Sequence, residues 1–563
     1  MQEIEKYNQW LNQEGLDGEV RAQLEKIKDD KNEIFESFYK DLEFGTAGLR
    51  GILGAGTNRM NIYTVGKATE GFAKYLLANF ENPSIAIAYD SRINSELFAW
   101  TSARIMAQNG IKVYLYGELM PTPMLSYAVR FYNCSGGIVI TASHNPAKYN
   151  GYKVYGPDGC QAGPEMADAI LAEIEKTDIF NVKLADKNDS HIEIIPDSTI
   201  ESFVDTILKE RVCVDKNAVK NLNIVYTPLN GTGLMPVMHT FKKMGIENVT
   251  VVKEQEKPDG NFPTCPYPNP EMREALEKGI ETLEKCGGDI LIATDPDADR
   301  VGTAVKHKNE YVLISGNEMG VLMLDYISRI RTENGTMPKN PVAVKTIVTT
   351  AMVDDVAASY GIKLESVLTG FKFIGGVIAD LEEHNRVEDY LLGFEESYGY
   401  LIGVHARDKD AVSACMLIAD MAAYYKSQGK TLIDVLDELF EKYGYYNNKT
   451  VSFAFEGASG MEKMAGIMES LRTNPPKTVA GAEITEISDY KLSVTKNAQG
   501  ETKILLPKSN VLAYKLSDGC SFVVRPSGTE PKLKVYMFAK ADSAEKSRAR
   551  VEELKNALEK IIN

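Results

Sequence analysis

The stretch GGIVITASHNP (residues 136–146) decides the fold of this chain, because two related stretches follow it later in the sequence. These counterparts are GGDILIATDPDADR (287–300) and DYLLGFEESYG (389–399). Each stretch opens with a short apolar run, typical of a strand buried in a parallel sheet, and then changes to polar and charged residues. Ligands of open α/β sheets sit beyond the carboxyl ends of the strands. We therefore expect each polar cluster to belong to a ligand site.

The same order of elements precedes each of these three strands. A helix-like segment ends at a glycine followed by isoleucine, which predicts a C-cap glycine leading into a strand. These transitions are QNGIKVYLYG (108–117), KMGIENVTVV (243–252) and SYGIKLESVL (359–368). The upstream strands, each followed by a helix, are IAIAYD (85–90), LNIVYTPL (222–229) and VAVKTIVTT (342–350). The chain is therefore interpreted as three successive βαβαβ units with right-handed crossovers and mainly parallel sheets.

The two ends of the chain follow other patterns. The N-terminal residues have the charge pattern of an amphipathic helix, and the C-terminal residues alternate between apolar and polar positions before a terminal helix. The predicted fold class is α/β, with three tandem βαβαβ-type mixed-sheet domains plus a smaller C-terminal α+β domain. The expected boundaries are 1–40 for an N-terminal helical extension and then 41–210, 211–330, 331–445 and 446–563 for four domains.

Composition excludes several classes of partner. A formal net charge of −16 over 563 residues argues against non-specific binding to nucleic acid or to an anionic membrane, since both need a positive field. No apolar run approaches the ~20 residues that span a bilayer, and the longest, AVSACMLIADMAAYY (411–425), carries Asp420. Seven cysteines without a C-x-x-C pair fit reduced thiols. A cytoplasmic protein is expected, and any anionic ligand would need a locally basic site.

Three carboxylates follow the second of the apolar strands at alternate positions, Asp295, Asp297 and Asp299. Carboxylates in this pattern can converge on one hard cation, and oxygen ligands are those that Mg²⁺ prefers. The alternative is a solvated acidic loop, but the position directly after a buried strand favours a metal site. An EF-hand is excluded because Arg300 stands where its loop needs glycine. Three carboxylates leave coordination positions open, which a phosphate oxygen can fill.

Ser143 and His144 follow the first strand and raise the question of a hydrolase. We do not expect a hydrolytic triad, because adjacent side chains seldom face each other and no G-x-S-x-G motif is present. A serine that carries phosphate, placed by one unit next to a metal held by the next, explains both clusters. His144 is interpreted equally well as a polar turn residue or as a catalytic group.

Further candidates lie in loops later in the chain. RPSGTEP (525–531) combines a guanidinium, hydroxyls and backbone amides, as phosphate capture requires, or forms a capped Pro/Gly turn. The FEES segment (394–397) offers two carboxylates and a hydroxyl, suited to vicinal sugar hydroxyls or to a buried ion pair. Four cations lie at strand ends or glycine-rich turns, where an anion can be held: Arg50, Lys372, Arg407 and Lys409.

Five motifs, taken in order, resemble the α-D-phosphohexomutase superfamily, and in particular its long phosphoglucomutase or phosphopentomutase-like branch. They are FGTAGLRG (44–51), TASHNP (141–146), DPDADR (295–300), FEES (394–397) and RPSGTEP (525–531). The resemblance covers the chain from about residue 40 onward. It implies four domains around a central cleft and an Mg²⁺-dependent enzyme that moves a phosphoryl group between the C1 and C6 oxygens of a hexose. The expected activity is that of a phosphoglucomutase, interconverting α-D-glucose 1-phosphate and glucose 6-phosphate through a phosphoserine enzyme.

The resemblance also implies roles for individual residues. Ser143 would be the phosphoserine and would bind the metal together with Asp295, Asp297 and Asp299. The catalytic group would further include Arg50, His144 and Lys153, with Lys153 a candidate for proton transfer. The substrate-binding residues would be Arg300, Thr369, Gly370, Lys372, Glu395, Ser397, Lys409, Arg525, Ser527, Gly528 and Thr529. Glucose 1,6-bisphosphate would be both intermediate and activator, and small sugar phosphates would be the partners.

One departure from the family pattern concerns the sugar site. Members of the family often have G-E-E-S, whereas here Phe394 separates Gly393 from Glu395. Because a few loop contacts decide which sugar hydroxyls are recognised, phosphomannomutase and phosphopentomutase activities are alternatives to the preferred glucose activity. A non-catalytic sugar-phosphate sensor would lack a nucleophile or a metal ligand, and none is missing. An aspartyl-phosphate phosphatase would release inorganic phosphate and would not need Ser143.

Overall fold

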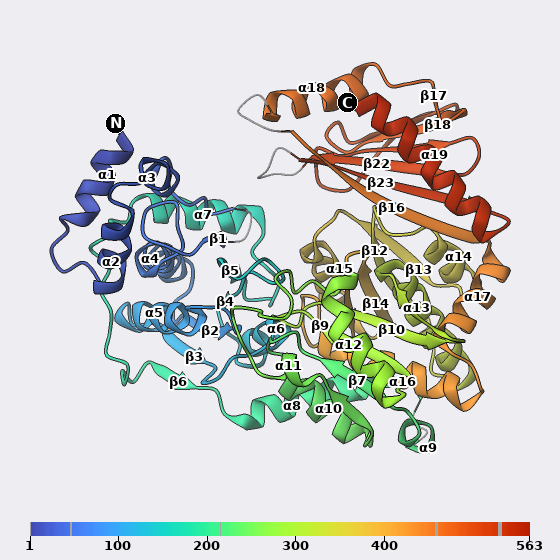
Figure 1. Cartoon of the computed structure of the whole chain (residues 1–563), viewed down its shortest axis with the longest axis horizontal. Coiled ribbons are helices and arrows are strands. Elements are labelled where there is room, and N and C mark those ends of the chain that lie inside the picture. The colour runs from blue at the N-terminus through green and yellow to red at the C-terminus, as the bar shows by residue number, and fades with distance from the viewer. Residues whose placement is uncertain (1, 46–47, 214–215, 456–459, 527–531, 563) are drawn as a thin grey trace.

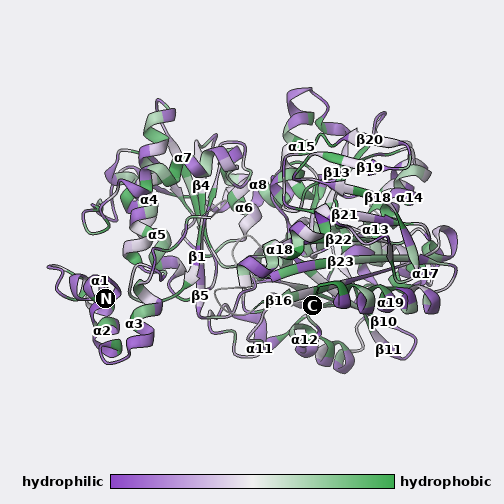
Figure 2. Cartoon of the chain, turned by 90° about the horizontal axis from the view of Figure 1, so that it is seen from above, coloured by the Kyte–Doolittle hydropathy of each residue, from purple (hydrophilic) through white to green (hydrophobic). Residues whose placement is uncertain are grey.

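The computed structural model describes residues 2–45, 48–213, 216–455, 460–526 and 532–562. The chain forms four sheets, one in each of four successive units, and helices cover the sheets (Figure 1). In Figure 1 the first unit (blue to teal) lies to the left of the second and third (green to yellow), and the fourth (orange to red) lies over the third. Strands such as β4 (Gly136–Ile140) are mostly hydrophobic, whereas helices such as α5 (Ser95–Gln108) alternate in character (Figure 2).

Three short helices begin the chain and pack on the first unit. They are α1 (Gln2–Leu11), α2 (Gly18–Ile27) and α3 (Lys31–Phe38). Asp17 and Asp30 cap α2 and α3 by accepting hydrogen bonds from backbone amides of the first turn. Trp10 is buried and makes edge-to-face ring contacts with Tyr63 and Phe180 of the first unit. These aromatic contacts attach the helical segment to the first unit.

The first unit has a six-stranded mixed sheet in the order β1-β5-β4-β2-β3-β6. Strand β2 lies between β3 and β4 and is parallel to both, while β5 and β1 add an antiparallel edge. Its strands are β1 (Gly48–Ile52), β2 (Ser84–Tyr89), β3 (Lys112–Leu115), β4, β5 (Tyr149–Tyr155) and β6 (Ile192–Ile194). Its helices are α4 (Ile62–Asn79), α5, α6 (Thr122–Phe131), α7 (Pro164–Glu175) and α8 (Asp197–Ile207).

The second unit repeats the pattern, with the sheet order β11-β10-β9-β7-β8. Strand β7 is parallel to β8 and β9, and the hairpin of β10 and β11 is antiparallel. The strands are β7 (Ile224–Thr227), β8 (Val249–Val251), β9 (Ile290–Thr294), β10 (Val301–His307) and β11 (Glu310–Ile314). The helices are α9 (Lys216–Lys220), α10 (Leu234–Met244), α11 (Lys253–Glu256) and α12 (Arg273–Cys286).

The third unit has the order β13-β12-β14-β15, with β12 again parallel to both of its neighbours. The strands are β12 (Val342–Thr346), β13 (Lys363–Val367), β14 (Tyr390–Glu395) and β15 (Gly399–Ile402). The helices are α13 (Gly316–Glu333), α14 (Met352–Ser359), α15 (Phe371–Glu383), α16 (Ala411–Ser427) and α17 (Leu432–Tyr443). The shared strand order confirms the predicted repeat. In each repeat a glycine with a left-handed backbone follows the corresponding helix. These glycines are Gly110 after α5 (φ 75°), Gly245 after α10 (φ 84°) and Gly361 after α14 (φ 66°).

In its described residues, the fourth unit is an antiparallel sheet with two helices, as the predicted α+β domain requires. The strands are β16 (Tyr445–Ala454), β17 (Thr478–Val479), β18 (Ala482–Asp489), β19 (Val494–Asn497), β20 (Gly500–Lys503), β21 (Leu512–Leu516), β22 (Ser521–Pro526) and β23 (Lys532–Ala541). The helices are α18 (Gly460–Thr473) and α19 (Ala544–Ile562). The sequence patterns did not reveal β18, β21 or α18, because none of these segments has a long apolar repeat.

The hydrophobic cores explain how the units hold together. One continuous cluster runs through the first three units, whereas the fourth unit has a core of its own. The longest apolar segment, α16, lies inside the shared core, where its Asp420 pairs with Arg211 at 2.8 Å. Among the residues that the structure describes, no helix has the length and apolar character that a bilayer crossing needs. A small cluster around Val348 and Tyr536 joins the third and fourth units.

Candidate active site

Ser143 lies at the end of β4, where the strand turns sharply. Its side chain is buried, and its backbone has a φ of 51°, a left-handed conformation uncommon for residues other than glycine. The Ser143 amide donates to Thr141 Oγ1 at 2.8 Å, and the Asn145 amide donates to Ala142 O at 3.1 Å. Strained conformations of this kind concentrate at functional sites. The turn aims the Ser143 hydroxyl out of the sheet edge toward the second unit.

The three predicted metal ligands lie in the turn after β9. Asp295, Asp297 and Asp299 are all buried, and one carboxylate oxygen from each lies within 4.8 Å of the other two. Asp295 Oδ1 accepts from the backbone amides of Asp299 (3.0 Å) and Arg300 (2.9 Å), which orients its carboxylate. The Oδ1 atoms of Asp297 and Asp299 are buried, and neither has a hydrogen-bond partner in the described part of the chain. Buried acceptors without donors fit a bound cation.

The serine and the acidic cluster meet in the structure. Ser143 Oγ donates to Asp295 Oδ2 at 2.9 Å, although the two residues are 152 positions apart in the chain. Thr122, at the start of α6, makes a second contact between the units, since its Oγ1 donates to Asp297 Oδ2 at 3.0 Å. Parallel strands of both units therefore point their carboxyl ends at one place. A hydroxyl nucleophile and a cation-binding cluster can act there together.

The carboxylates of the acidic cluster repel one another, and this repulsion changes their pKa values. Burial and the neighbouring charges of Asp297 and Asp299 raise the pKa of Asp295 well above its usual range. The pKa of Asp299 is also raised, by burial and by Asp297. Burial alone would raise the pKa of Asp297, but the Lys153 ammonium holds it below its usual range. Three buried carboxylates of this kind need a positive charge to be ionised together.

Cations from the first and third units lie around the acidic cluster. Lys153 on β5 lies 3.0 Å from Asp297 Oδ2, and Lys409 lies 3.1 Å from Asp299 Oδ2. Burial alone would lower the pKa of Lys409, but Asp299 raises it. Arg50 on β1 is opposite Gly151 of β5, two residues before Lys153, and its side chain is exposed. Among the described residues, Arg50 forms no ion pair, so its guanidinium is free to meet an anion.

His144 departs from expectation. Its Nδ1 lies 3.1 Å from Ser143 Oγ, so the expectation that these adjacent side chains do not face each other was wrong. The left-handed backbone of Ser143 turns the serine side chain toward its neighbour. Burial, reinforced by Arg300, lowers the pKa of His144 well below its usual range, so the imidazole is neutral. In the described part of the chain no carboxylate is hydrogen-bonded to His144, so the arrangement is not a hydrolytic triad.

The third unit brings its own polar residues to the same region. Gly370, at the N-terminus of α15, has a φ of 116° and donates its amide to Glu395 Oε1 at 2.9 Å. Arg300 Nη1 donates to the Ser397 carbonyl at 3.0 Å and also pairs with Glu271. Arg300 thus ties the turn after β9 to the turn after β14.

Two further residues of the third unit lie in the predicted loops. Lys372 follows Thr369 and Gly370 in the first turn of α15, and burial lowers its pKa. Arg407 was a candidate cation in the sequence, but its side chain is fully buried and its Nη2 pairs with Glu382 at 2.7 Å. Arg407 is therefore part of the packing and does not offer its charge to a ligand.

Phe394, the departure from the family motif, belongs to the core. Its ring packs on α13 at Gly320, where an added Cβ would lie 2.1 Å from the ring, and it stacks on Tyr400 with a centroid distance of 6.3 Å. Successive side chains of a strand point to opposite faces, so Phe394 and Glu395 face apart. The extra aromatic residue therefore fills space behind the strand.

Arg525 of the fourth unit lies on β22, beside the third unit. The neighbouring Tyr536 has its pKa raised to about 12 by burial and by Glu396, with Arg525 acting in the opposite direction. Arg525 and Glu396, in the turn after β14, therefore act on the same phenol. Ser527, Gly528 and Thr529, the other predicted phosphate-binding residues, lie outside the described residues.

Sequence reasoning missed Arg92, Thr122 and Glu271. Arg92 follows β2, and its guanidinium donates to the Ser143 carbonyl. Ligands of open α/β sheets lie beyond the carboxyl ends of the strands, and Arg92 lies at such an end in IAIAYDSR (85–92). The sequence therefore did contain a signal for Arg92. Thr122 and Glu271 lie in segments without a comparable pattern, and only tertiary contacts reveal them.

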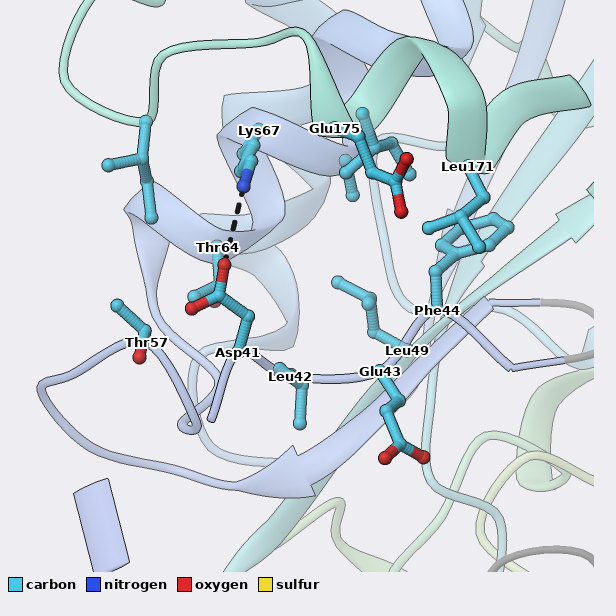
Figure 3. A pocket seen from close by; sticks show the side chains of 13 residues that line it. Asp41, Leu42, Glu43, Phe44, Leu49, Thr57, Thr64, Lys67, Leu171 and Glu175 are labelled. Carbon is cyan, nitrogen blue, oxygen red and sulfur yellow. Dashed lines mark ion pairs between the residues drawn. The ribbon is translucent and has the colours of Figure 1, made fainter. Parts of the chain in front are cut away.

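A separate cavity of about 300 Å³ lies in the first unit, between the segment that leads into β1 and the helices α4 and α7. Figure 3 shows Lys67 directed at Asp41, with Leu171 above Phe44. The walls also include Glu43 and Glu175, so acidic groups outnumber the one lysine. The excess of negative charge repels a dianionic sugar phosphate, so this cavity is not a second site of the kind found around Ser143.

Comparison with known proteins agrees with this geometry. Four models of the phosphoglucomutase/phosphomannomutase family match in order: alpha/beta/alpha domain I at 41–179, domain II at 201–308, domain III at 315–443 and the C-terminal domain at 474–556. Curated phosphoglucomutases of Staphylococcus aureus strains USA300 and N315 are each 36% identical over 526 residues, covering 92% of this chain and 93% of theirs.

Solved structures support the fold. A putative phosphomannomutase from Thermus thermophilus has a TM-score of 0.68 at 22% identity, covering 92% of this chain and 99% of its own. The open form of parafusin, a phosphoglucomutase from Paramecium, has a TM-score of 0.66 at 18% identity, covering 93% and 95%. The four domain matches and the full-length relatives lead to one conclusion: this chain belongs to the phosphoglucomutase/phosphomannomutase family.

Proposed function

We propose that the chain is a phosphoglucomutase that interconverts α-D-glucose 1-phosphate and glucose 6-phosphate. The observation that carries this proposal is the contact of Ser143 Oγ with Asp295 Oδ2 at 2.9 Å, inside a buried cluster of three carboxylates. A hydroxyl in this place can accept and donate a phosphoryl group next to a bound cation. The S. aureus relatives, which carry the name phosphoglucomutase, support the choice of glucose.

The residues of the acidic cluster fit Mg²⁺, which Asp295, Asp297 and Asp299 would hold together with a phosphoryl oxygen on Ser143. The ion would supply charge neutralisation for the phosphoryl group. The surrounding cations act on the same group: Lys153 and Arg50 approach from the first unit, and Arg300 and Lys409 from the other side. Such electrostatic stabilisation is the main means of catalysis in phosphoryl transfer.

In the proposed cycle, phosphorylated Ser143 gives its phosphoryl group to O6 of glucose 1-phosphate. The Ser143 Oγ–P bond breaks as the O6–P bond forms, and the O6 proton ends on Ser143 Oγ, which leaves as a hydroxyl, while the Lys153 ammonium stabilises charge on the transferring group. Glucose 1,6-bisphosphate then reorients, Ser143 Oγ attacks the C1 phosphoryl group, and the proton returns to the departing O1. Glucose 6-phosphate leaves and the phosphoserine is restored, so atoms and charges balance. Loss of phosphate to water would end the cycle, so Ser143 must be shielded, and its side chain is buried.

The remaining predicted residues would hold the sugar and the distal phosphate. Glu395 is the last residue of β14, beside Gly370, and Ser397 lies in the turn that follows; both would bind sugar hydroxyls together with Thr369 and Lys372. Arg525, Ser527, Gly528 and Thr529 would hold the phosphate that does not react. We also propose a cytoplasmic location, supported by seven cysteines that are all free thiols.

Side-by-side kinetics test the function. Glucose 1-phosphate, mannose 1-phosphate and ribose 1-phosphate are compared with glucose 1,6-bisphosphate present, and isomer formation and phosphate release are both measured. We expect the highest kcat/KM for glucose 1-phosphate, little phosphate release, and loss of activity with EDTA that Mg²⁺ restores. A clear preference for mannose or pentose would overturn the substrate assignment. Phosphate released as fast as the substrate disappears would overturn the mutase assignment in favour of a phosphatase.

A further inference from the structure

The loop that carries Ser143 is held by one buried cation, Arg92. Its guanidinium donates to the carbonyls of Pro146 at 3.1 Å and Tyr149 at 3.0 Å, and it also donates to those of Ser143 and Asn145. The side chain of Arg92 has no exposed surface. Four carbonyls gathered on one planar cation fix the path of the loop, because a guanidinium presents its donors in a rigid fork.

A loop of the second unit covers the face of this guanidinium. The Phe262 ring centroid lies 5.0 Å from Arg92 Cζ, in the geometry of a cation–π contact. Gly260 in the same loop lies so close that an added Cβ would be 2.5 Å from Ile93 N and 2.8 Å from Ser91 O. The two loops therefore meet backbone to backbone, and only glycine fits at position 260.

The loop that carries Phe262 is also joined to the acidic turn. The Asp259 amide donates to Asn230 O at 3.0 Å. The two residues after Asn230 contact the acidic turn directly: the Thr232 amide donates to Pro296 O at 2.9 Å, and a Cβ on Gly231 would lie 2.3 Å from Pro296 Cα. Backbone contacts thus run from the acidic turn, through two loops of the second unit, to the loop of Ser143.

Backbone strain follows the same route. Left-handed φ angles occur at Leu229 (47°), Asn230 (58°) and Phe262 (47°), and at both ends of the route, Ala298 (48°) and Ser143 (51°). Residues other than glycine rarely adopt this conformation, and strain of this kind persists where the surrounding structure enforces it. The route is therefore a constrained connection and not an incidental contact.

We propose that Arg92, Gly260 and Phe262 are positioning residues through which the second unit sets the place of Ser143 Oγ relative to the metal-binding turn. The direct hydrogen bond from Ser143 Oγ to Asp295 requires the hydroxyl proton. A phosphoryl group on Oγ removes that proton, so the direct link is lost in the phosphoenzyme. The route through Arg92 and Phe262 uses backbone carbonyls and a ring, and it is unaffected by phosphorylation. It keeps the two loops in register through the whole cycle.

Kinetics of Phe262→Leu and Gly260→Ala test this proposal, which rests on the proposed mutase function. Misplacing a reacting group by about 1 Å can cost about 100-fold in rate, so we expect kcat to fall by about 10- to 100-fold. KM should stay within about twofold, because substrate contacts are untouched. Phe241→Leu, in the core of the second unit, is the matched control: it should lower Tm but leave kcat unchanged. Wild-type kcat in both folded loop variants would overturn the proposal.

Two further measurements separate positioning from general stability. Arg92→Ala should lose turnover and regain part of it with millimolar guanidinium chloride, but not with sodium chloride, because the guanidinium ion can refill the carbonyl-lined space.

Hydrogen exchange in residues 141–150 should be faster in Phe262→Leu than in Phe241→Leu. This readout needs no activity, so it judges the positioning proposal even if the wild-type chain has no mutase turnover. Equal exchange in the two variants would contradict it.

Discussion

Ser143 combines two properties at one residue, a strained backbone and a buried hydroxyl. A left-handed φ of 51° turns its side chain toward both Asp295 and His144. Strain at a reactive residue is maintained only if the surroundings enforce it, and here the carbonyl contacts of Arg92 do so. The serine therefore has little freedom to adopt another orientation.

Removing the Ser143 hydroxyl should abolish the chemistry. For Ser143→Ala, we expect kcat on glucose 1-phosphate with bisphosphate supplied to fall by about 10⁴-fold or more, as is typical when a nucleophile is removed. Intact-mass measurement should show a phosphoryl adduct on the wild type and none on the variant. Ser135→Ala, which removes another buried serine hydroxyl of the same unit, is the control. Near-normal turnover of Ser143→Ala would show that the phosphoryl group is carried elsewhere.

Glu396 should make stability depend on pH. Burial, together with Glu395, raises its pKa to about 8, compared with about 4.3 for an unfolded chain. The folded state therefore holds a proton that the unfolded state has lost, and this contribution to stability is complete below pH 4.3 and disappears as pH rises through 8. We expect Glu396→Gln to gain Tm relative to the wild type as pH increases from 5 to 9. Scanning calorimetry at each pH measures this, with Glu383→Gln as control, and parallel curves would contradict it.

At the scale of elements, the order of strands and helices along the chain and three helix ends could be predicted, because their signals are local. Gly110, Gly245 and Gly361 each end a helix in the left-handed conformation, which almost only glycine adopts freely, so Gly-Ile marked the same junction three times. Strand β18 was missed because its alternation breaks at the register shift between Ile484 and Glu486, whereas β21 (LAYKL) alternates between buried and more exposed residues, so its signal was present. Thr122 and Glu271 were missed for another reason, since their roles exist only through tertiary contacts.

The packing of Phe394 of β14 on α13 should affect the free energy of unfolding but not which sugar phosphate is preferred. Phe394→Ala removes a buried ring, which typically costs about 3–5 kcal/mol of unfolding free energy. Urea unfolding measures this loss, and we expect the ratio of kcat/KM for glucose 1-phosphate to that for mannose 1-phosphate to remain unchanged. A shift of that ratio by tenfold would show that the ring reaches the sugar.

The pair of Phe394 and Gly320 offers an internal control. Gly320→Ala alone should destabilise the chain, because the added methyl group would meet the ring of Phe394 at 2.1 Å. In the Phe394→Ala background, the same change should be tolerated, since the ring is gone. Additive effects in this double-mutant cycle would contradict the contact.

At the scale of the whole molecule, the site gathers cations inside an acidic protein. The chain carries a net charge of −16, yet Lys153, Lys409, Arg300 and Arg50 lie around the acidic turn. A local positive region concentrates a dianionic substrate while the outer surface stays negative. The fourth unit has a core of its own and is joined to the third by the small cluster around Val348 and Tyr536, while the first three units share one core.

Arg525 tests whether the fourth unit holds substrate. Losing a charge-assisted hydrogen bond costs about 1.5–3 kcal/mol, so Arg525→Ala should raise KM by about 10- to 100-fold with little change in kcat. Steady-state kinetics on glucose 1-phosphate measure both constants. Arg548→Ala, on the exposed face of α19, removes the same charge from the same unit as a control. A collapse of kcat at constant KM would place Arg525 at the reacting phosphate.

The 152 positions that separate Ser143 from Asp295 have a consequence for biosynthesis. At about 5–20 residues per second, a ribosome makes the acidic turn roughly 8–30 s after the serine. During that delay the nascent polypeptide displays the serine with no carboxylates beside it, so it cannot assemble a phosphorylation centre. A fragment released by premature termination in this interval would lack the acidic turn, so it could not form the site.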